Sequence, residues 1–165
     1  MADTAVVEQS RAIPVVVGHA FEATLSVPLT SIFSRRYVLL PPIKEVRDQH
    51  GTWGEVGQTR IVVTSDGGTM REQLVTVDPP HAFSYRLSDI TGPMGPLVDS
   101  IEGSWGFEPA GTGTLVTWRW ALHPTRVGVV AMPLITTMWR PYAARALERL
   151  SDLLVSPDPP GHTAD

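Results

Sequence analysis

Residues 100–122 hold three of the five tryptophans of the chain, on two short alternating runs joined by a glycine-rich turn. Trp118 and Trp120 are two residues apart, so on a strand both side chains point to the same face. Val116 and Leu122 share that face. The pattern predicts a β-hairpin with an apolar inner face, on which the indoles either fill a core or line a cavity for an apolar ligand.

Composition excludes several classes of protein. The 165 residues, 42% hydrophobic and 18% charged, suit one domain with a sizeable core. A net charge of −4 with scattered basic residues argues against binding of nucleic acid. The absence of cysteine excludes a disulfide framework and a cysteine nucleophile. No signal-peptide pattern and no run of about 18 apolar residues is found, so we expect a cytoplasmic protein without integral membrane association.

Helical and extended segments can be placed along the chain. We expect a first strand over residues 12–25, a short helix over 29–33 after Pro28, and a short helix or turn over 42–48. Segments of strand length, separated by turn signals, then occur at residues 57–65, 69–77, 81–90, 100–107 and 114–123. The order predicts an antiparallel sheet built from successive hairpins.

The last regular segment, residues 132–155, has the apolar period of one long helix. Pro141 lies within it and predicts a kink or restart near Arg140. The expected fold is therefore α+β, a curved antiparallel sheet of about six to seven strands wrapped on the C-terminal helix. It forms a single domain over residues 12–155, with flexible termini at 1–11 and 156–165.

Three segments carry a family resemblance. Residues 71–87 read REQLVTVDPPHAFSYRL, residues 103–120 read GSWGFEPAGTGTLVTWRW, and residues 143–154 read AARALERLSDLL. In this order they resemble the START-like helix-grip superfamily (SRPBCC), most closely its polyketide cyclase/dehydrase-like and lipid-transfer branch. The resemblance covers about residues 12–155. It implies a helix-grip fold whose members bind lipids, sterols, polyketides or plant hormones between sheet and helix, a few of them as cyclases or dehydratases.

Residues for the walls of such a cavity can be chosen by alternation and helical period. The apolar candidates are Tyr85, Trp105, Trp118 and Trp120 on strands, and Met138, Trp139 and Tyr142 on the helix. Glu72 falls on the apolar face of its strand, where a carboxylate needs a partner and its pKa would rise. We expect that partner to be Arg86 or a ligand hydroxyl, unless a bulge turns Glu72 into solvent.

Two aromatic or apolar loop features leave alternatives open. Trp53, between Gly51 and Gly54, either plugs the rim of the cavity or packs on the sheet edge. The segment at residues 92–97, rich in glycine and proline, is either a gate over the cavity or a long hairpin connection.

Motifs for metal and nucleotide chemistry are not found. The five histidines have no metal-ligand spacing, so no metal site is expected. The glycine pairs near residues 67 and 111 precede strands rather than helices, which argues against a phosphate loop. We expect no cofactor.

Three functions remain open. The first is binding of a hydrophobic small molecule, such as a lipid, sterol or polyketide, with Glu72 or Arg86 orienting it. The second is a cyclase or dehydratase in which Glu72 acts as general base and Tyr85 or Arg86 polarises a carbonyl group. Because no catalytic pair stands at diagnostic spacing, binding without catalysis is favoured. The third is a cavity-free domain acting through protein contacts, and a homodimer is one option.

Overall fold

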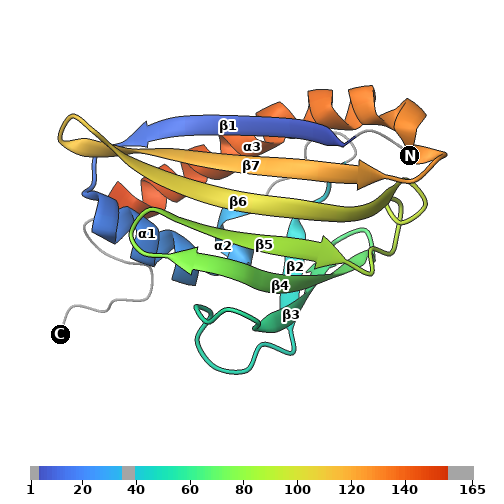
Figure 1. The fold of residues 1–165 in the computed structure, drawn as a ribbon, viewed down its shortest axis with the longest axis horizontal. Helices are drawn as coiled ribbons and strands as arrows, with labels where there is room; N and C mark the ends of the chain where they lie inside the picture. Colours follow the sequence, from blue (N-terminus) through green and yellow to red (C-terminus); the bar gives the residue numbers. More distant parts are fainter. Residues whose placement is uncertain (1–3, 35–39, 156–165) are drawn as a thin grey trace.

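The computed structural model describes residues 4–34 and 40–155. Within these residues, seven strands form one antiparallel sheet in the order β1-β7-β6-β5-β4-β3-β2 (Figure 1). The strands are β1 (Ala5–Ile13), β2 (Ile43–Arg47), β3 (Thr59–Thr64), β4 (Thr69–Asp78), β5 (Ala82–Ser88), β6 (Val98–Ala110) and β7 (Gly113–Pro124). The helices are α1 (Val17–Ser26), α2 (Leu29–Ile32), the short 3₁₀ helix η1 (Gly128–Ala131) and α3 (Met132–Val155).

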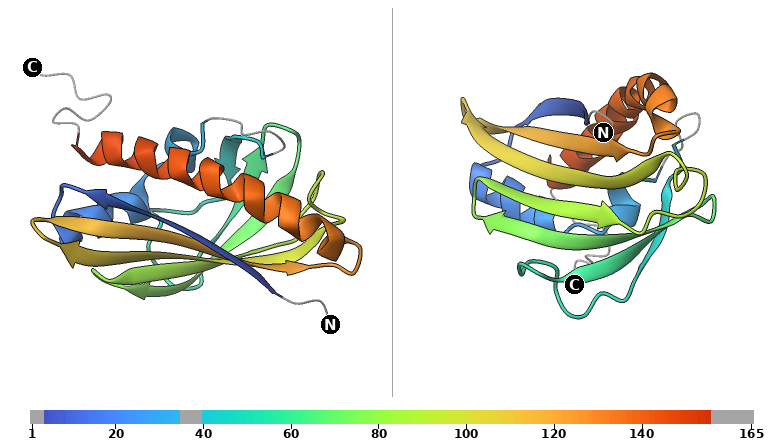
Figure 2. Two further views of the ribbon diagram at one scale, coloured as in Figure 1. Left: turned by 90° about the horizontal axis from the view of Figure 1, so that it is seen from above. Right: turned by 45° about the vertical axis from the view of Figure 1, so that its right-hand side comes forward.

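The sheet is curved, and all helices lie on one side of it (Figures 1 and 2). α3 runs along the β1–β7 half of the sheet (Figure 2). α1 packs against β6 and β7, and α2 packs against β2, each beside α3. The apolar face of α3 is buried against these elements, with Ile135, Trp139 and Leu150 at most 5% exposed. The expected α+β helix-grip architecture is confirmed, and the long helix has the predicted bounds.

The β6–β7 hairpin is the longest part of the sheet. Its strands pair from Val98–Pro124 to Ala110–Gly113, so Trp105 lies opposite Trp118. The turn contains Gly111 at φ 59°, a left-handed conformation that suits a residue without Cβ. As alternation predicts, every second residue of β7 from position 114 to 124 is buried on the inner face.

The N-terminal prediction was wrong in two places. Residues expected to be frayed form β1, which pairs with β7 and buries Val7 and Ile13. The expected strand at residues 12–25 is instead mostly α1. Its buried positions, Ala20, Phe21, Thr24 and Leu25, recur at helical spacing. The run of three valines at 15–17 made this segment look extended, although the helical period begins at Val17.

The segment over 42–48 was also predicted wrongly. It forms β2, an edge strand that pairs with β3 and carries a register shift between Ile43 and Glu45. Prolines 41 and 42 precede the strand, where no ladder hydrogen bond is lost. The short helix after Pro28 is confirmed as α2. The predicted domain start at residue 12 falls within β1, and the expected tail at 156–165 lies outside the described residues.

Candidate functional site

A cavity of about 100 Å³ lies between the inner face of the sheet and the helices. Its walls come from α1, α2, strands β2 to β7, and Tyr142 of α3. Most of the wall is aliphatic or aromatic, and besides two tyrosines its polar residues are Thr24, Arg60, Thr64, Asp66, Thr69, Glu72 and Thr91. The cavity occupies the region where the curved sheet and α3 diverge, because α3 packs mainly against β1 while β3 and β4 turn away (Figure 2).

Tyr85 lies at the centre of the aromatic wall. Its hydroxyl oxygen accepts hydrogen bonds from two indoles, Trp118 Nε1 at 2.8 Å and Trp120 Nε1 at 2.9 Å. The Trp118 ring stacks on Trp105, with centroids 5.3 Å apart and planes at 11°. Trp139 of α3 packs against both indoles, with its ring centre 4.8 Å from that of Trp118 and 5.8 Å from that of Trp120. The rings are therefore fixed by both packing and directed hydrogen bonds.

Gly103 on β6 makes room for this arrangement. It pairs with Tyr85 on β5 and with Trp120 on β7, so it sits beneath the tyrosine ring. A Cβ at position 103 would lie 2.1 Å from Tyr85 Cζ and 2.4 Å from its hydroxyl oxygen. A glycine in the middle of a strand commonly marks such a close approach. Here it lets the Tyr85 ring lie across the sheet and reach both indoles.

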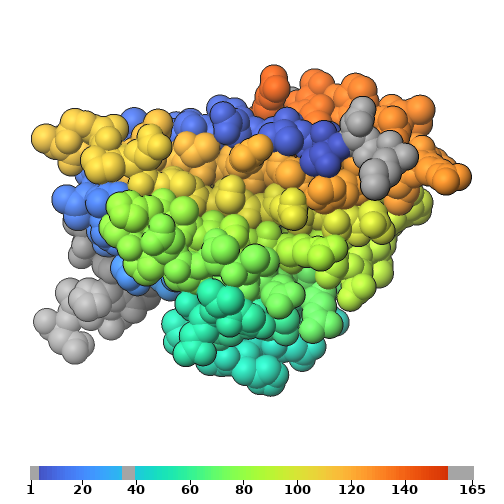
Figure 3. All heavy atoms as spheres, viewed as in Figure 1, coloured from blue at the N-terminus to red at the C-terminus, as the bar shows by residue number. Residues whose placement is uncertain are grey.

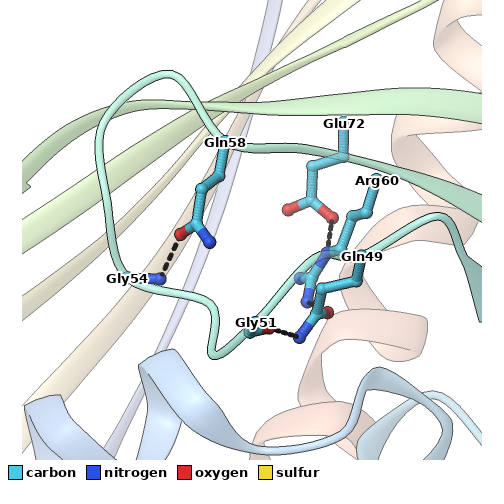
Figure 4. Close-up of polar contacts among 6 residues, drawn as sticks. All are labelled: Gln49, Gly51, Gly54, Gln58, Arg60 and Glu72. Carbon is cyan, nitrogen blue, oxygen red and sulfur yellow. Dashed lines mark hydrogen bonds and ion pairs between the residues drawn. The ribbon is translucent and has the colours of Figure 1, made fainter.

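Glu72 is buried in the wall of the cavity beside Arg60 (Figure 4). Arg60 Nε donates a hydrogen bond to Glu72 Oε1 at 2.8 Å, and both side chains are at most 7% exposed. Arg60 Nη1 donates to Gln49 Oε1 at 3.0 Å, and its guanidinium lies 3.9 Å from the centre of the Trp53 ring. The charge of Arg60 is thus stabilised by a carboxylate, an amide oxygen and an aromatic face.

The loop that carries Gln49 and Trp53 is held by its own side chains. Gln58 Oε1 accepts a hydrogen bond from the backbone N–H of Gly54 at 2.7 Å (Figure 4). It accepts a second from the backbone N–H of Glu55 at 2.6 Å. Gln49 Nε2 donates to the carbonyl of Gly51 at 3.0 Å. Trp53 is 4% exposed, lines the cavity and lies against Arg60 of β3. Its role as a plug of the rim stays a prediction.

Burial controls the protonation of the site. It raises the pKa of Glu72 above its ordinary value, and the neighbouring Arg60 charge and hydrogen bond offset part of that rise. Burial also raises the pKa of Tyr85, and the charge of Glu72 raises it further. Tyr85 is therefore a neutral hydroxyl at physiological pH.

The structure brings together six of the nine predicted ligand-binding residues. Those that line the cavity are Glu72, Tyr85, Trp105, Trp118, Trp120 and Tyr142. The Tyr142 hydroxyl donates to the carbonyl of Pro41 at 3.1 Å. Met138 and Trp139 are buried in the core but are not part of the wall. Trp139 lies behind the wall, in contact with the indoles of Trp118 and Trp120.

Arg86 does not belong to the site. It alternates with Tyr85 and Leu87 on β5, so its side chain is exposed on the outer face of the sheet, which none of the described helices covers (Figure 3). In the β4–β5 register it lies opposite Gln73, while Glu72 lies opposite Leu87. The expected Glu72–Arg86 pair is therefore wrong, and Arg60 takes its place.

Sequence reasoning missed six polar residues of the wall, of which Arg60 and Thr24 are the two most deeply buried. Arg60 alternates with Val62 and Thr64 on β3, and this period of two already indicated the inner face. Thr24 lies on the buried face of α1, 5% exposed, and its hydroxyl has no hydrogen-bond partner among the described residues. It was missed because its segment was taken for a strand.

Pro93 and Met94 of the predicted gate segment also line the cavity. Gating by this segment stays a prediction. In the described part of the chain, no group of three acidic or histidine side chains could hold a metal ion. No helix in that part is long and apolar enough to cross a membrane.

Solved structures share this fold. Major latex-like protein 151 from Panax ginseng superposes with a TM-score of 0.65 at 17% identity, covering 93% of this chain and 99% of that one. Norcoclaurine synthase from Thalictrum flavum, in complex with dopamine and hydroxybenzaldehyde, gives 0.67 at 17% identity, covering 99% and 91%. At this identity the likeness concerns the fold alone.

Among curated proteins, none matches the chain in sequence. A family model described as polyketide cyclase / dehydrase and lipid transport matches residues 4–155, nearly the whole described chain. The match confirms the resemblance found in the sequence, and both family and fold fit the binding of hydrophobic ligands. The chain therefore belongs to the polyketide cyclase / dehydrase and lipid transport family.

Proposed function

We propose that the protein binds a hydrophobic small molecule in the cavity between sheet and helices. The observation that carries this proposal is the composition of the wall, in which aromatic and aliphatic side chains surround a few fixed polar groups. Such walls are typical of ligand sites. The cavity also argues against the cavity-free alternative. The homodimer stays a prediction, for which sedimentation equilibrium is the test.

The size of the cavity favours a compact ligand. Its volume of about 100 Å³ is somewhat below the roughly 150 Å³ of an engineered apolar cavity that holds benzene. A one-ring compound suits this space as it stands, and a small two-ring compound such as indane requires the wall to shift, whereas a sterol or a long acyl chain is far too large. The structural neighbour norcoclaurine synthase, crystallised with dopamine and hydroxybenzaldehyde, supports ligands of this size in the same fold.

A blocking variant tests the proposal. Met70→Trp places a large ring in the cavity wall, whereas Gln73→Trp places the same ring on the outer face of the same strand. We expect indane to bind to the wild type and Gln73→Trp alike, and at least about ten-fold more weakly to Met70→Trp, because the new ring fills its space. Isothermal titration calorimetry measures the three affinities. The proposal fails if the wild type binds none of indane, cholesterol and palmitate, or if Met70→Trp binds as well as the control.

A second candidate is catalysis on a carbon acid, favoured by the presence of Glu72 and Tyr85 in one wall. The Glu72 carboxylate would take a proton from the carbon next to a carbonyl group, while the Tyr85 hydroxyl donates to the enolate oxygen that develops. Since Arg86 faces away, Tyr85 is the group left to polarise the carbonyl.

Deuterium exchange tests this candidate. In D₂O the wild type should accelerate exchange of the C2 protons of 1-indanone, followed by NMR. Glu72→Gln should exchange these protons at least about ten-fold more slowly, since general bases contribute factors of about 10² to 10⁴. It should still bind 1-indanone. Glu102→Gln, which changes an exposed carboxylate on the outer face, is the control. Equal exchange rates in wild type and Glu72→Gln would exclude Glu72 as the base.

A further inference from the structure

The hydrogen bonds at Tyr85 leave the proton of its hydroxyl group without an acceptor among the described residues. A tyrosine hydroxyl has one proton to donate and lone pairs that accept. Trp118 and Trp120 both donate to this oxygen, at 2.8 and 2.9 Å, so its accepting positions are occupied. No described residue accepts the Tyr85 proton, although the side chain is 7% exposed and lines the cavity. Since buried donors are nearly always paired, we look for the missing acceptor in the contents of the cavity that this side chain lines.

Thr24 on α1 carries a second buried hydroxyl group that lacks a hydrogen-bond partner among the described residues. This residue belongs to the α1 part of the wall. A threonine in a helix can bond the carbonyl of the preceding turn, and this one does not. Two buried hydroxyl groups of the wall, one from the sheet and one from a helix, thus carry protons that no described residue accepts. Both favour a ligand with polar atoms.

The charges around the cavity indicate that the ligand is neutral. Arg60 and Glu72 compensate each other at 2.8 Å, so neither is left to pair with an ion. The other ionisable acid of the wall is Asp66, which is exposed in the β3–β4 turn and accepts a hydrogen bond from Thr64 at 2.6 Å. A ligand carboxylate would lose its hydration without gaining a cationic partner. An ammonium group in the interior would likewise lack a free carboxylate.

Resting on the proposed function, we propose that the cavity selects an uncharged compound of one or two rings that carries a hydrogen-bond-accepting oxygen, such as a ketone. The oxygen takes the proton of the Tyr85 hydroxyl, while the aromatic wall holds the rings. Thr24 can serve a second polar group. The two indole donors orient the tyrosine hydroxyl before the ligand arrives, which lowers the entropic cost of forming the bond.

Four ligands of one skeleton test this selection at neutral pH by calorimetry. They are indane, 1-indanone, indane-1-carboxylate and 1-aminoindane in its ammonium form. We expect 1-indanone to bind about three- to ten-fold more tightly than indane, as one net hydrogen bond implies. The carboxylate and the amine should bind more weakly than indane. If none of the four binds, the proposed function itself fails. If indane binds and 1-indanone gains nothing, or a charged member binds best, only the selection is overturned.

Two variants identify the donor. Tyr85→Phe should bind indane and 1-indanone equally. Thr76→Val, which removes an exposed hydroxyl of β4 that lies outside the cavity and bonds the Ser84 hydroxyl at 2.6 Å, should keep the preference. The infrared carbonyl band of 1-indanone bound to the wild type should lie at lower wavenumber than in hexane. This band decides the matter even if Tyr85→Phe does not fold, because an unshifted band would show that no hydroxyl donates to the carbonyl.

Discussion

Replacing Arg60 by methionine should lower the free energy of unfolding by about 3–5 kcal/mol, the usual cost of removing one partner of a buried ion pair. The reason is that Glu72 would keep its burial and lose the guanidinium 2.8 Å away. Gln49 and Trp53 would lose their contacts with Arg60 as well. Urea denaturation followed by circular dichroism measures the change.

The double variant Arg60→Met/Glu72→Leu is the control. It removes both charges and leaves a hydrophobic pair, so it should recover most of the stability that the single variant loses. If the double variant is as unstable as Arg60→Met, the loss arises from the packing of the Arg60 side chain, and the argument from an uncompensated carboxylate is wrong.

The loss in Arg60→Met should also depend on pH. Burial raises the folded-state pKa of Glu72 above the value of 4.5 that it has when exposed. The folded state therefore binds this proton more tightly than the unfolded state, and stability decreases as pH rises from about 4.5 through the folded-state pKa. Without Arg60 that pKa rises further. The variant should thus lose more stability, relative to wild type, at about pH 8 than at about pH 5. An equal loss at both pH values would contradict this account.

Substitution of Gly103 by alanine should cost about 3 kcal/mol. The added methyl group would meet the Tyr85 ring at 2.1 Å, so the ring must move and both indole hydrogen bonds would be strained or lost. Near-ultraviolet circular dichroism should show a changed aromatic environment. Urea denaturation should show the lower stability.

Gly106→Ala provides a matched comparison on the same strand. A Cβ at position 106 would have no atom within 4 Å. Its replacement should be neutral or slightly stabilising, since glycine weakens a strand interior. A similar cost at both positions would mean that backbone conformation, rather than the tyrosine ring, requires glycine at position 103.

Much of the fold could be predicted because its signals are local. The α3 bounds follow from the apolar period of 3.6 residues, and the hairpins from β3 to β7 follow from alternation and turn residues. The N-terminal errors have a physical cause. β1 carries four polar residues in a row, at positions 8–11, and buries only Val7 and Ile13. It is stabilised by pairing with β7 across more than 100 residues of sequence. Pairing between segments this far apart produces no pattern within a short stretch of sequence.

The parts of the site that depend only on the face of a strand to which a side chain points could be predicted from the sequence. Alternation placed Glu72 and the indoles of β7 inside, because a period of two fixes the direction of each side chain. It could not identify the partner of Glu72, which depends on how β3 and β4 align. Their register sets Arg60 opposite Glu72. The roles of Gly103 and of the Tyr85 hydroxyl depend on three strands at once, so no single segment indicates them.

The clustering of the indoles has an optical consequence. Four of the five tryptophans, at positions 105, 118, 120 and 139, form a chain in which neighbouring ring centres are less than 6 Å apart. At such separations the transition dipoles couple, and excitation migrates between rings before emission. The cluster should therefore absorb and emit as one chromophore, with an exciton couplet in circular dichroism. A ligand that touches any one of these rings would change the emission of all four.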